Sequence, residues 1–169
     1  AHFSVSQAGS LLYRRGERVR PTSALVWVDR AARETPVGAP SRAYFHPRLS
    51  PDGARIAVEV MGTQAGVWVY SLGRETLSRF TVGDGLNAIW TPTGDRLTFE
   101  ASGGRSRGIY WRKWDGTGGD EQLTTTGSVR NVPSSWSPDG QELVFMDEKG
   151  DTWVYRASER RSTPLLDSQ

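Results

Sequence analysis

One short motif recurs along this chain and limits its fold more than any other feature. It reads LSPDGARIAVEV at 49–60 and WSPDGQELVFMD at 136–147, and the variant WTPTGDRLTFEA lies between them at 90–101. The motif prolines Pro51, Pro92 and Pro138 are 41 and 46 residues apart. Gly9 precedes Gly53 by a similar interval and marks a degenerate first copy. Internal periodicity of this length is typical of repeat proteins.

Each copy predicts four short strands and no helix. The apolar segments are short, rich in β-branched and aromatic residues, and bounded by Gly, Asp, Pro or Ser. A repeat of about 40 to 45 residues with four strands is the blade of a β-propeller. We therefore predict an all-β chain of four propeller blades in one partial domain over 1–169, with blades at approximately 1–41, 42–84, 85–128 and 129–169. In the last three blades we expect innermost strands near 43–49, 86–91 and 130–136, second strands near 54–60, 95–101 and 141–147, third strands near 66–72, 108–114 and 151–157, and outer strands near 75–81, 120–124 and 162–166.

The turns and tryptophans explain why the copies resemble one another. In x-Pro-Asp-Gly, proline fixes its own φ and glycine adopts a conformation that a side chain resists, which predicts tight antiparallel hairpins. One blade cannot bury both of its apolar faces, so equivalent residues recur where blades pack together. We assign to that packing the tryptophans that share a repeat position, and the alternative for them is an aromatic platform for sugars or bases: Trp27, Trp68, Trp90, Trp136 and Trp153. Trp111 and Trp114 lie outside this phase and are candidates for an exposed contact.

Composition excludes several classes of function. The formal net charge is only +2, with 21 Lys and Arg against 19 Asp and Glu, so no basic footprint for nucleic acid is present. The chain has no cysteine, which excludes disulfides, a thiol nucleophile and a Cys-based zinc site. No apolar run reaches the length of a membrane span, so we expect no membrane insertion.

The motif-bearing segments resemble a known family. LSPDGARIAVEV, GVWVYSL, RETLSRFT and SSWSPDGQELVFMD look like the WD-repeat-like blades of the TolB family. Their order also resembles the propellers that lie C-terminal to the kinase domain in some bacterial serine/threonine protein kinases. Because full propellers of this family usually have six or more blades, the resemblance implies that these four belong to a larger propeller. It also favours an extracytoplasmic, periplasmic location.

Local matches to catalytic and metal motifs have weak structural context. Gly104 to Gly108 matches G-x-S-x-G around Ser106, but a nucleophile elbow needs a strand, a sharp turn and a helix. Asp147 and Asp151 lack the alternating oxygen ligands of a calcium loop, so we interpret them as hairpin residues. His2 and His46 have no paired spacing, and the Gly-rich segment at 115–121 precedes no helix. We predict no catalytic activity, no cofactor and no metal site in this chain.

The remaining candidates lie where the innermost strands begin, because in a propeller these positions line the central channel. We predict a channel-face binding site formed by Tyr44, His46, Asn87, Arg130 and Asn131, with Phe45 beside them. The alternative is that Asn87 and Asn131 serve turns and that Tyr44 packs in the core.

Two functions remain open at this point. The first is a non-enzymatic module that recognises a protein or peptide, such as the sensor region of a bacterial receptor kinase or envelope protein. The second is the gating propeller of a prolyl-oligopeptidase-like serine hydrolase whose catalytic domain lies outside this chain. We also expect the terminal blades to self-associate.

Overall fold

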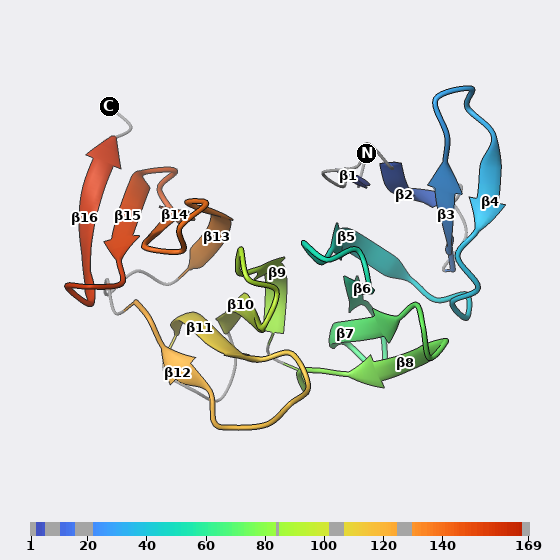
Figure 1. Ribbon diagram of the computed structural model, residues 1–169. Coiled ribbons are helices and arrows are strands. Elements are labelled where there is room, and N and C mark those ends of the chain that lie inside the picture. The colour runs from blue at the N-terminus through green and yellow to red at the C-terminus, as the bar shows by residue number, and fades with distance from the viewer. Residues whose placement is uncertain are drawn as a thin grey trace. The chain divides into compact units, whose positions relative to one another are not determined.

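Over the residues that the structure describes, the fold consists of four antiparallel sheets with four strands each (Figure 1). The computed structural model describes residues 3–5, 11–15, 22–83, 85–101, 107–124 and 130–166, and every regular element in these ranges is a strand. Each sheet is formed by four strands that are consecutive in the sequence. The predicted all-β architecture of four propeller blades is therefore confirmed.

The strand bounds follow the predicted pattern closely. The first blade contains β1 (Phe3–Val5), β2 (Leu11–Arg15), β3 (Ala24–Val28) and β4 (Glu34–Pro36). The second contains β5 (Tyr44–Leu49), β6 (Arg55–Val60), β7 (Gly66–Ser71) and β8 (Thr76–Arg79). The third contains β9 (Gly85–Trp90), β10 (Arg96–Ala101), β11 (Gly108–Lys113) and β12 (Glu121–Gln122). The fourth contains β13 (Asn131–Trp136), β14 (Glu142–Asp147), β15 (Thr152–Arg156) and β16 (Arg161–Leu166).

The motif forms the hairpin between the first two strands of the second blade. The backbone N–H of Gly53 donates to the carbonyl of Ser50 at 2.9 Å, and Gly53 has a φ of 70°. The Ser50 hydroxyl donates to the Asp52 carboxylate at 2.5 Å and accepts from the backbone N–H of Arg55 at 2.9 Å. A serine and an aspartate thus close the turn through side-chain hydrogen bonds. Ser137 and Asp139 make the same bonds in the fourth blade.

The third-blade turn keeps this geometry with different residues. Thr93 replaces the motif aspartate, and the Asp95 carboxylate accepts from the hydroxyls of both Thr91 and Thr93. The Gly94 N–H still donates to the Thr91 carbonyl at 2.9 Å. The carboxylate has therefore moved along the turn, and its role in closing the hairpin is preserved.

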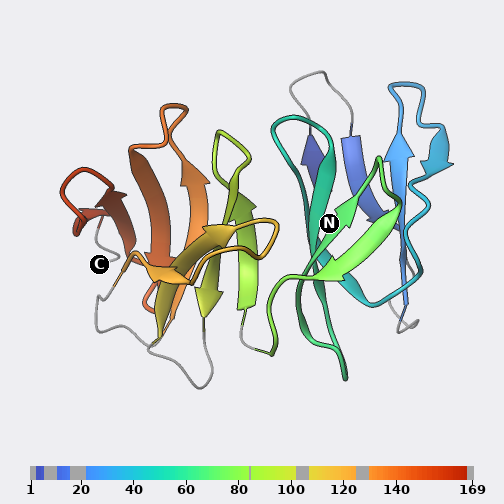
Figure 2. The same ribbon diagram turned by 60° about the horizontal axis from the view of Figure 1, so that its bottom comes forward.

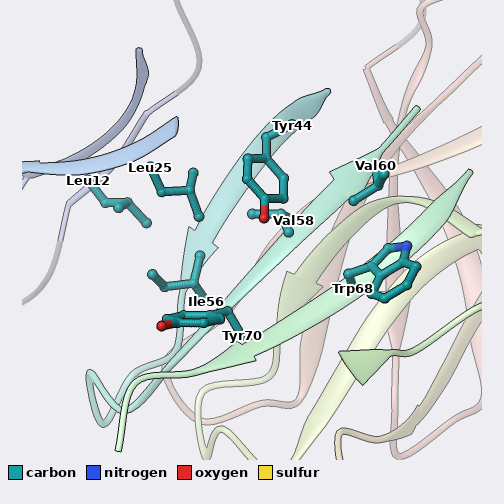
Figure 3. Close-up of a cluster of buried hydrophobic side chains, with 8 residues drawn as sticks. All are labelled: Leu12, Leu25, Tyr44, Ile56, Val58, Val60, Trp68 and Tyr70. Atoms are coloured by element: carbon teal, nitrogen blue, oxygen red, sulfur yellow. The ribbon is translucent and has the colours of Figure 1, made fainter. Parts of the chain in front are cut away.

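The chain divides into two compact units, Ala1–Gly83 and Asp84–Gln169, with two blades each. In the first unit, Leu12 and Leu25 of the first blade pack against apolar side chains of the second, as Figure 3 shows. The second-blade members of this cluster are Tyr44, Ile56, Val58, Val60, Trp68 and Tyr70. Trp27 packs against the same cluster. Neighbouring blades thus bury each other's apolar faces, as the repeat pattern predicts.

The second unit has an equivalent core between its blades. Ile89, Ile109 and Leu123 of the third blade pack with Leu143, Phe145 and Tyr155 of the fourth, and β13 lies beside β9 and β10 (Figure 2). Trp136 and Trp153 pack against this cluster. The predicted inter-blade role is confirmed for Trp136, which bonds to Thr98 and stacks on Trp111 of the third blade. Trp27, Trp68 and Trp153 belong to or pack against these two cores, and Trp90 is buried in the third blade.

Trp111 corrects the expectation that it forms an exposed contact. Its ring stacks on Trp136 of the neighbouring blade with centroids 5.7 Å apart, and the Arg96 guanidinium lies 4.4 Å from its ring centroid. The indole N–H donates to the Glu121 carboxylate at 2.8 Å. Trp111 therefore belongs to the interface between the third and fourth blades. Trp114 is half-buried.

Candidate functional site

The five candidate residues occupy different positions along the innermost strands, and two of them are interior. Tyr44 and Asn131 each lie seven residues before the motif proline, and both are almost completely buried. The Tyr44 hydroxyl donates to the carbonyl of Pro40 at 2.5 Å, and burial raises the pKa of this side chain to about 12. Tyr44 belongs to the core, as the alternative interpretation predicts. Asn131 is the first residue of β13 and pairs with Asp147.

His46 and Asn87 share a second position, five residues before the motif proline. Their φ angles are 45° and 51°, in the left-handed region that most side chains avoid. Each lies at a register shift in the pairing of the innermost strand with the second strand, between β5 and β6 or between β9 and β10. Such β-bulges redirect a side chain, and strained backbone of this kind persists where the surrounding structure holds it. The fold thus presents these two side chains in the same unusual way.

A buried glutamate lies behind each of these residues. Glu59 and Glu100 are both eight residues after the motif proline, and their exposed fractions are 5% and 3%. His46 Nδ1 lies 2.9 Å from Glu59 Oε1, and Asn87 Nδ2 donates to Glu100 Oε2 at 2.7 Å. Because the Glu100 oxygen accepts this hydrogen bond, the amino group of the Asn87 side chain points toward the buried carboxylate. Each glutamate therefore contacts the side chain in front of it.

Arg130 completes the arrangement in the second unit. Its Nε lies 3.4 Å from Glu100 Oε1, although its side chain is 56% exposed. Its backbone N–H donates to Glu148 Oε2 at 3.2 Å. Arg130 precedes the innermost strand of the fourth blade, while Glu100 is on β10 of the third. The structure thus joins Asn87, Glu100 and Arg130 across a blade boundary, whereas it places Asn131 in the interior.

The fourth blade lacks this pairing. Pro133 and Met146 occupy the positions of Asn87 and Glu100, and Met146 is 43% exposed. The fourth blade still forms its four-stranded sheet and its motif turn. The glutamate pairs are therefore not required to build a blade.

Sequence reasoning missed Glu59 and Glu100. The available signal was an acidic residue at the same repeat position in two otherwise apolar strands, IAVEV and LTFEA. Lone buried carboxylates are costly, so such a repeated acid indicates a specific partner.

The possible catalytic and metal motifs of the sequence can be compared with the structure. Ser106 lies outside the described residues. The Asp147 carboxylate accepts from the backbone N–H groups of Lys149 and Asp151 and from the indole of Trp153, so Asp147 is a hairpin residue as predicted. Among the residues that the structure describes, no group of three or more His, Asp or Glu side chains could hold a metal ion. A search of the same residues finds no helix that is long and apolar enough to cross a membrane.

These sheets and hairpins define the class as a β-propeller, and comparison with solved structures makes the type more specific. TolB from Acinetobacter baumannii superimposes with a TM-score of 0.79 and 19% identity over 100% of this chain and 44% of its own. A putative TolB from Agrobacterium tumefaciens gives 0.76 and 21% over 99% of this chain and 61% of its own. The fold is therefore that of a TolB-like β-propeller, and this chain spans about half the length of these proteins.

Enzymes are also similar to this chain in fold. A prolyl endopeptidase structure has a TM-score of 0.66 and 16% identity over 100% of this chain and 29% of its own. No family model and no curated protein matches the sequence. The fold alone therefore does not distinguish a binding module from part of an enzyme.

Proposed function

We propose that this chain is a non-enzymatic recognition module that binds a protein or peptide through the channel ends of its blades. The observation that carries the proposal is the repeated pair of a left-handed innermost-strand residue and a buried glutamate, His46 with Glu59 and Asn87 with Glu100. A buried carboxylate and a strained backbone residue both cost free energy, by about 1 to 3 kcal/mol for the strain alone. Since the fourth blade forms without such a pair, a binding role would explain why the second and third blades contain one.

The resemblance in the motif segments supports a bacterial sensor or envelope protein. In a receptor kinase, such a module would form the region that recognises the signal. The full-length reading frame tests this context, because a kinase domain and a membrane span upstream would support it.

A peptide library displayed on phage tests the binding function. We expect the chain to enrich a family of peptides, and the variant that combines His46→Ala with Asn87→Ala to bind them at least about tenfold more weakly. The matched control combines Arg33→Ala with Gln141→Ala, both at exposed positions, and should bind normally. Thermal melting of each variant separates lost binding from lost folding. Failure to enrich any peptide, or equal binding by a folded double variant, would contradict the proposal.

A second candidate function is the gating propeller of a serine hydrolase. The likeness to the prolyl endopeptidase over this whole chain favours it. A serine-hydrolase domain downstream in the full-length frame would support it. In either case we expect the purified chain to turn over no ester or peptide substrate. Turnover that disappears in Ser106→Ala would show instead that the chain is an enzyme.

A further inference from the structure

The Arg130 guanidinium forms an ion pair with a buried glutamate. One carboxylate oxygen of Glu100 accepts a hydrogen bond from Asn87 Nδ2 at 2.7 Å, and the other oxygen lies 3.4 Å from Arg130 Nε. The Arg130 side chain is 56% exposed, so a ligand can reach its guanidinium. The ion pair with Glu100 thus favours one position of an otherwise exposed cation.

This geometry favours an anionic ligand group over a cationic one. Both oxygens of Glu100 already face nitrogen groups, so a ligand cation would have to displace Arg130 from a carboxylate that is only 3% exposed. An anion can instead approach the exposed guanidinium directly. Arginine binds carboxylates through two parallel N–H···O bonds, and a pre-positioned guanidinium loses less side-chain entropy on binding.

We propose that Arg130 binds a carboxylate of the protein or peptide ligand, with Glu100 and Asn87 as positioning residues. The inference rests on the proposed recognition function and names the chemistry that this site selects. The carboxylate comes from an acidic side chain or from a C-terminus. Glu148, which accepts from the Arg130 backbone N–H at 3.2 Å, is an exposed acid that weakens this attraction.

The test follows the Arg130 Nε–Hε resonance by NMR during titration with three small probes. N-acetylaspartate α-amide carries a side-chain carboxylate, N-acetylalanine carries a terminal carboxylate, and N-acetylasparagine amide is the neutral match. We expect saturable shifts with at least one carboxylate probe and none with the neutral probe. The probe that binds more tightly identifies the source of the carboxylate. Equal shifts with the neutral probe, or no shift with either carboxylate, would overturn the proposal.

Variants test the assigned roles. Arg130→Lys should lose at least about fivefold in carboxylate affinity because it keeps the charge but not the fork. Glu100→Gln should lose about threefold, while Glu148→Gln should gain about twofold. Arg33→Gln removes an exposed arginine whose partner is the exposed Asp29, and it should change nothing. If Glu100→Gln alters the melting temperature but not the preference for carboxylate over neutral probe, Glu100 is merely structural and the positioning role is wrong.

The displayed peptides separate this inference from the proposed function. Enriched peptides with a shared acidic position or a required free C-terminus would support both. Enriched peptides that are neutral or basic and that bind Arg130→Gln equally well would contradict this inference and leave the recognition function standing.

Discussion

At the scale of single residues, we expect substitution of two glycines outside the motif to reduce the free energy of unfolding more than substitution of the motif glycines. Gly66 and Gly108 begin the third strands of their blades with φ angles of 139° and 153°. A Cβ at these positions would lie 2.6 Å from the carbonyl oxygen of Thr81 and 2.5 Å from that of Thr124. The segment just after each outer strand therefore passes very close to the start of the third strand, and only glycine leaves room for it.

We predict that Gly66→Ala and Gly108→Ala each lower the free energy of unfolding by at least about 2 kcal/mol, because backbone strain and a backbone clash coincide. Gly73→Ala is the matched control, since its Cβ would meet nothing within 4 Å. It should change stability by less than about 1 kcal/mol. Chemical denaturation measures all three. If the alanine variants at 66 and 108 match the control, the close approach of the two strands is wrong.

The motif turns give a second residue-scale prediction. Gly53 and Gly140 both have a φ of 70°. A β-branched side chain is strongly disfavoured there, so Gly53→Val and Gly140→Val should each destabilise the protein by at least about 1 kcal/mol. Unchanged melting temperatures for both variants would show that these turns do not need the left-handed conformation.

At the scale of elements, the motif hairpins are closed by ionised aspartates. The hydrogen bond from Ser50 to Asp52 and that from Ser137 to Asp139 hold the pKa of each carboxyl below its usual value. For Asp95, burial acts to raise the pKa, but hydrogen bonds from Thr93 and Thr91 outweigh it, and the pKa is lowered. Three repeats thus stabilise the charged form of a turn carboxylate.

We therefore predict that the protein loses stability in acid. A carboxyl whose pKa is lower in the folded state contributes stability above its unfolded pKa, and that contribution disappears as pH falls through the folded pKa. The free energy of unfolding should decrease as pH drops below about 4. Combining Asp52→Asn with Asp139→Asn should flatten this decrease relative to the wild type. If the free energy of unfolding of the double variant falls equally steeply in acid, groups other than Asp52 and Asp139 cause the decrease.

The contact between β10 and β13 includes a buried polar bond within apolar packing. Trp136 Nε1 donates to the Thr98 hydroxyl at 2.9 Å, and Thr98 is completely buried. We predict that Trp136→Phe costs about 1 to 3 kcal/mol, because Thr98 loses a hydrogen-bond partner in the interior. Thr98→Val should cost less in the Trp136→Phe background than in the wild type. Strict additivity in this double-mutant cycle would show that the bond contributes nothing to docking of the blades.

At the scale of the whole molecule, the fourth blade lacks the two polar residues with which the third blade contacts its neighbour. On the third blade, Thr98 contacts Trp136 of the fourth blade, and Glu100 contacts Arg130. Val144 and Met146 occupy these positions on blade four, and Met146 is exposed. Val5 of the first blade and Leu165 of the fourth are also large exposed apolar residues. Exposed apolar faces and open sheet edges favour association.

We therefore expect copies of the chain to associate through their terminal blades. Sedimentation velocity across a concentration range should show a rising average mass, and Met146→Glu should shift it toward the monomer. Gln141→Glu is the control at another exposed position of the same blade. A closed four-bladed ring is the competing outcome, because propellers range down to four blades. A compact monomer at every concentration would contradict association and support closure.

The strands, the turns and the count of four blades could be predicted from the sequence because they depend on local chemistry. Pro51, Asp52 and Gly53 close a hairpin through partners within five residues, and the tryptophans mark the blade period. The sequence did not show which polar groups meet. Glu100 meets Arg130, and Trp111 packs on Trp136, only because two separate blades dock face to face. Such contacts between residues of different blades leave no local periodicity, so the sequence could suggest His46, Asn87 and Arg130 as candidates, but only the tertiary structure showed which buried acids they contact.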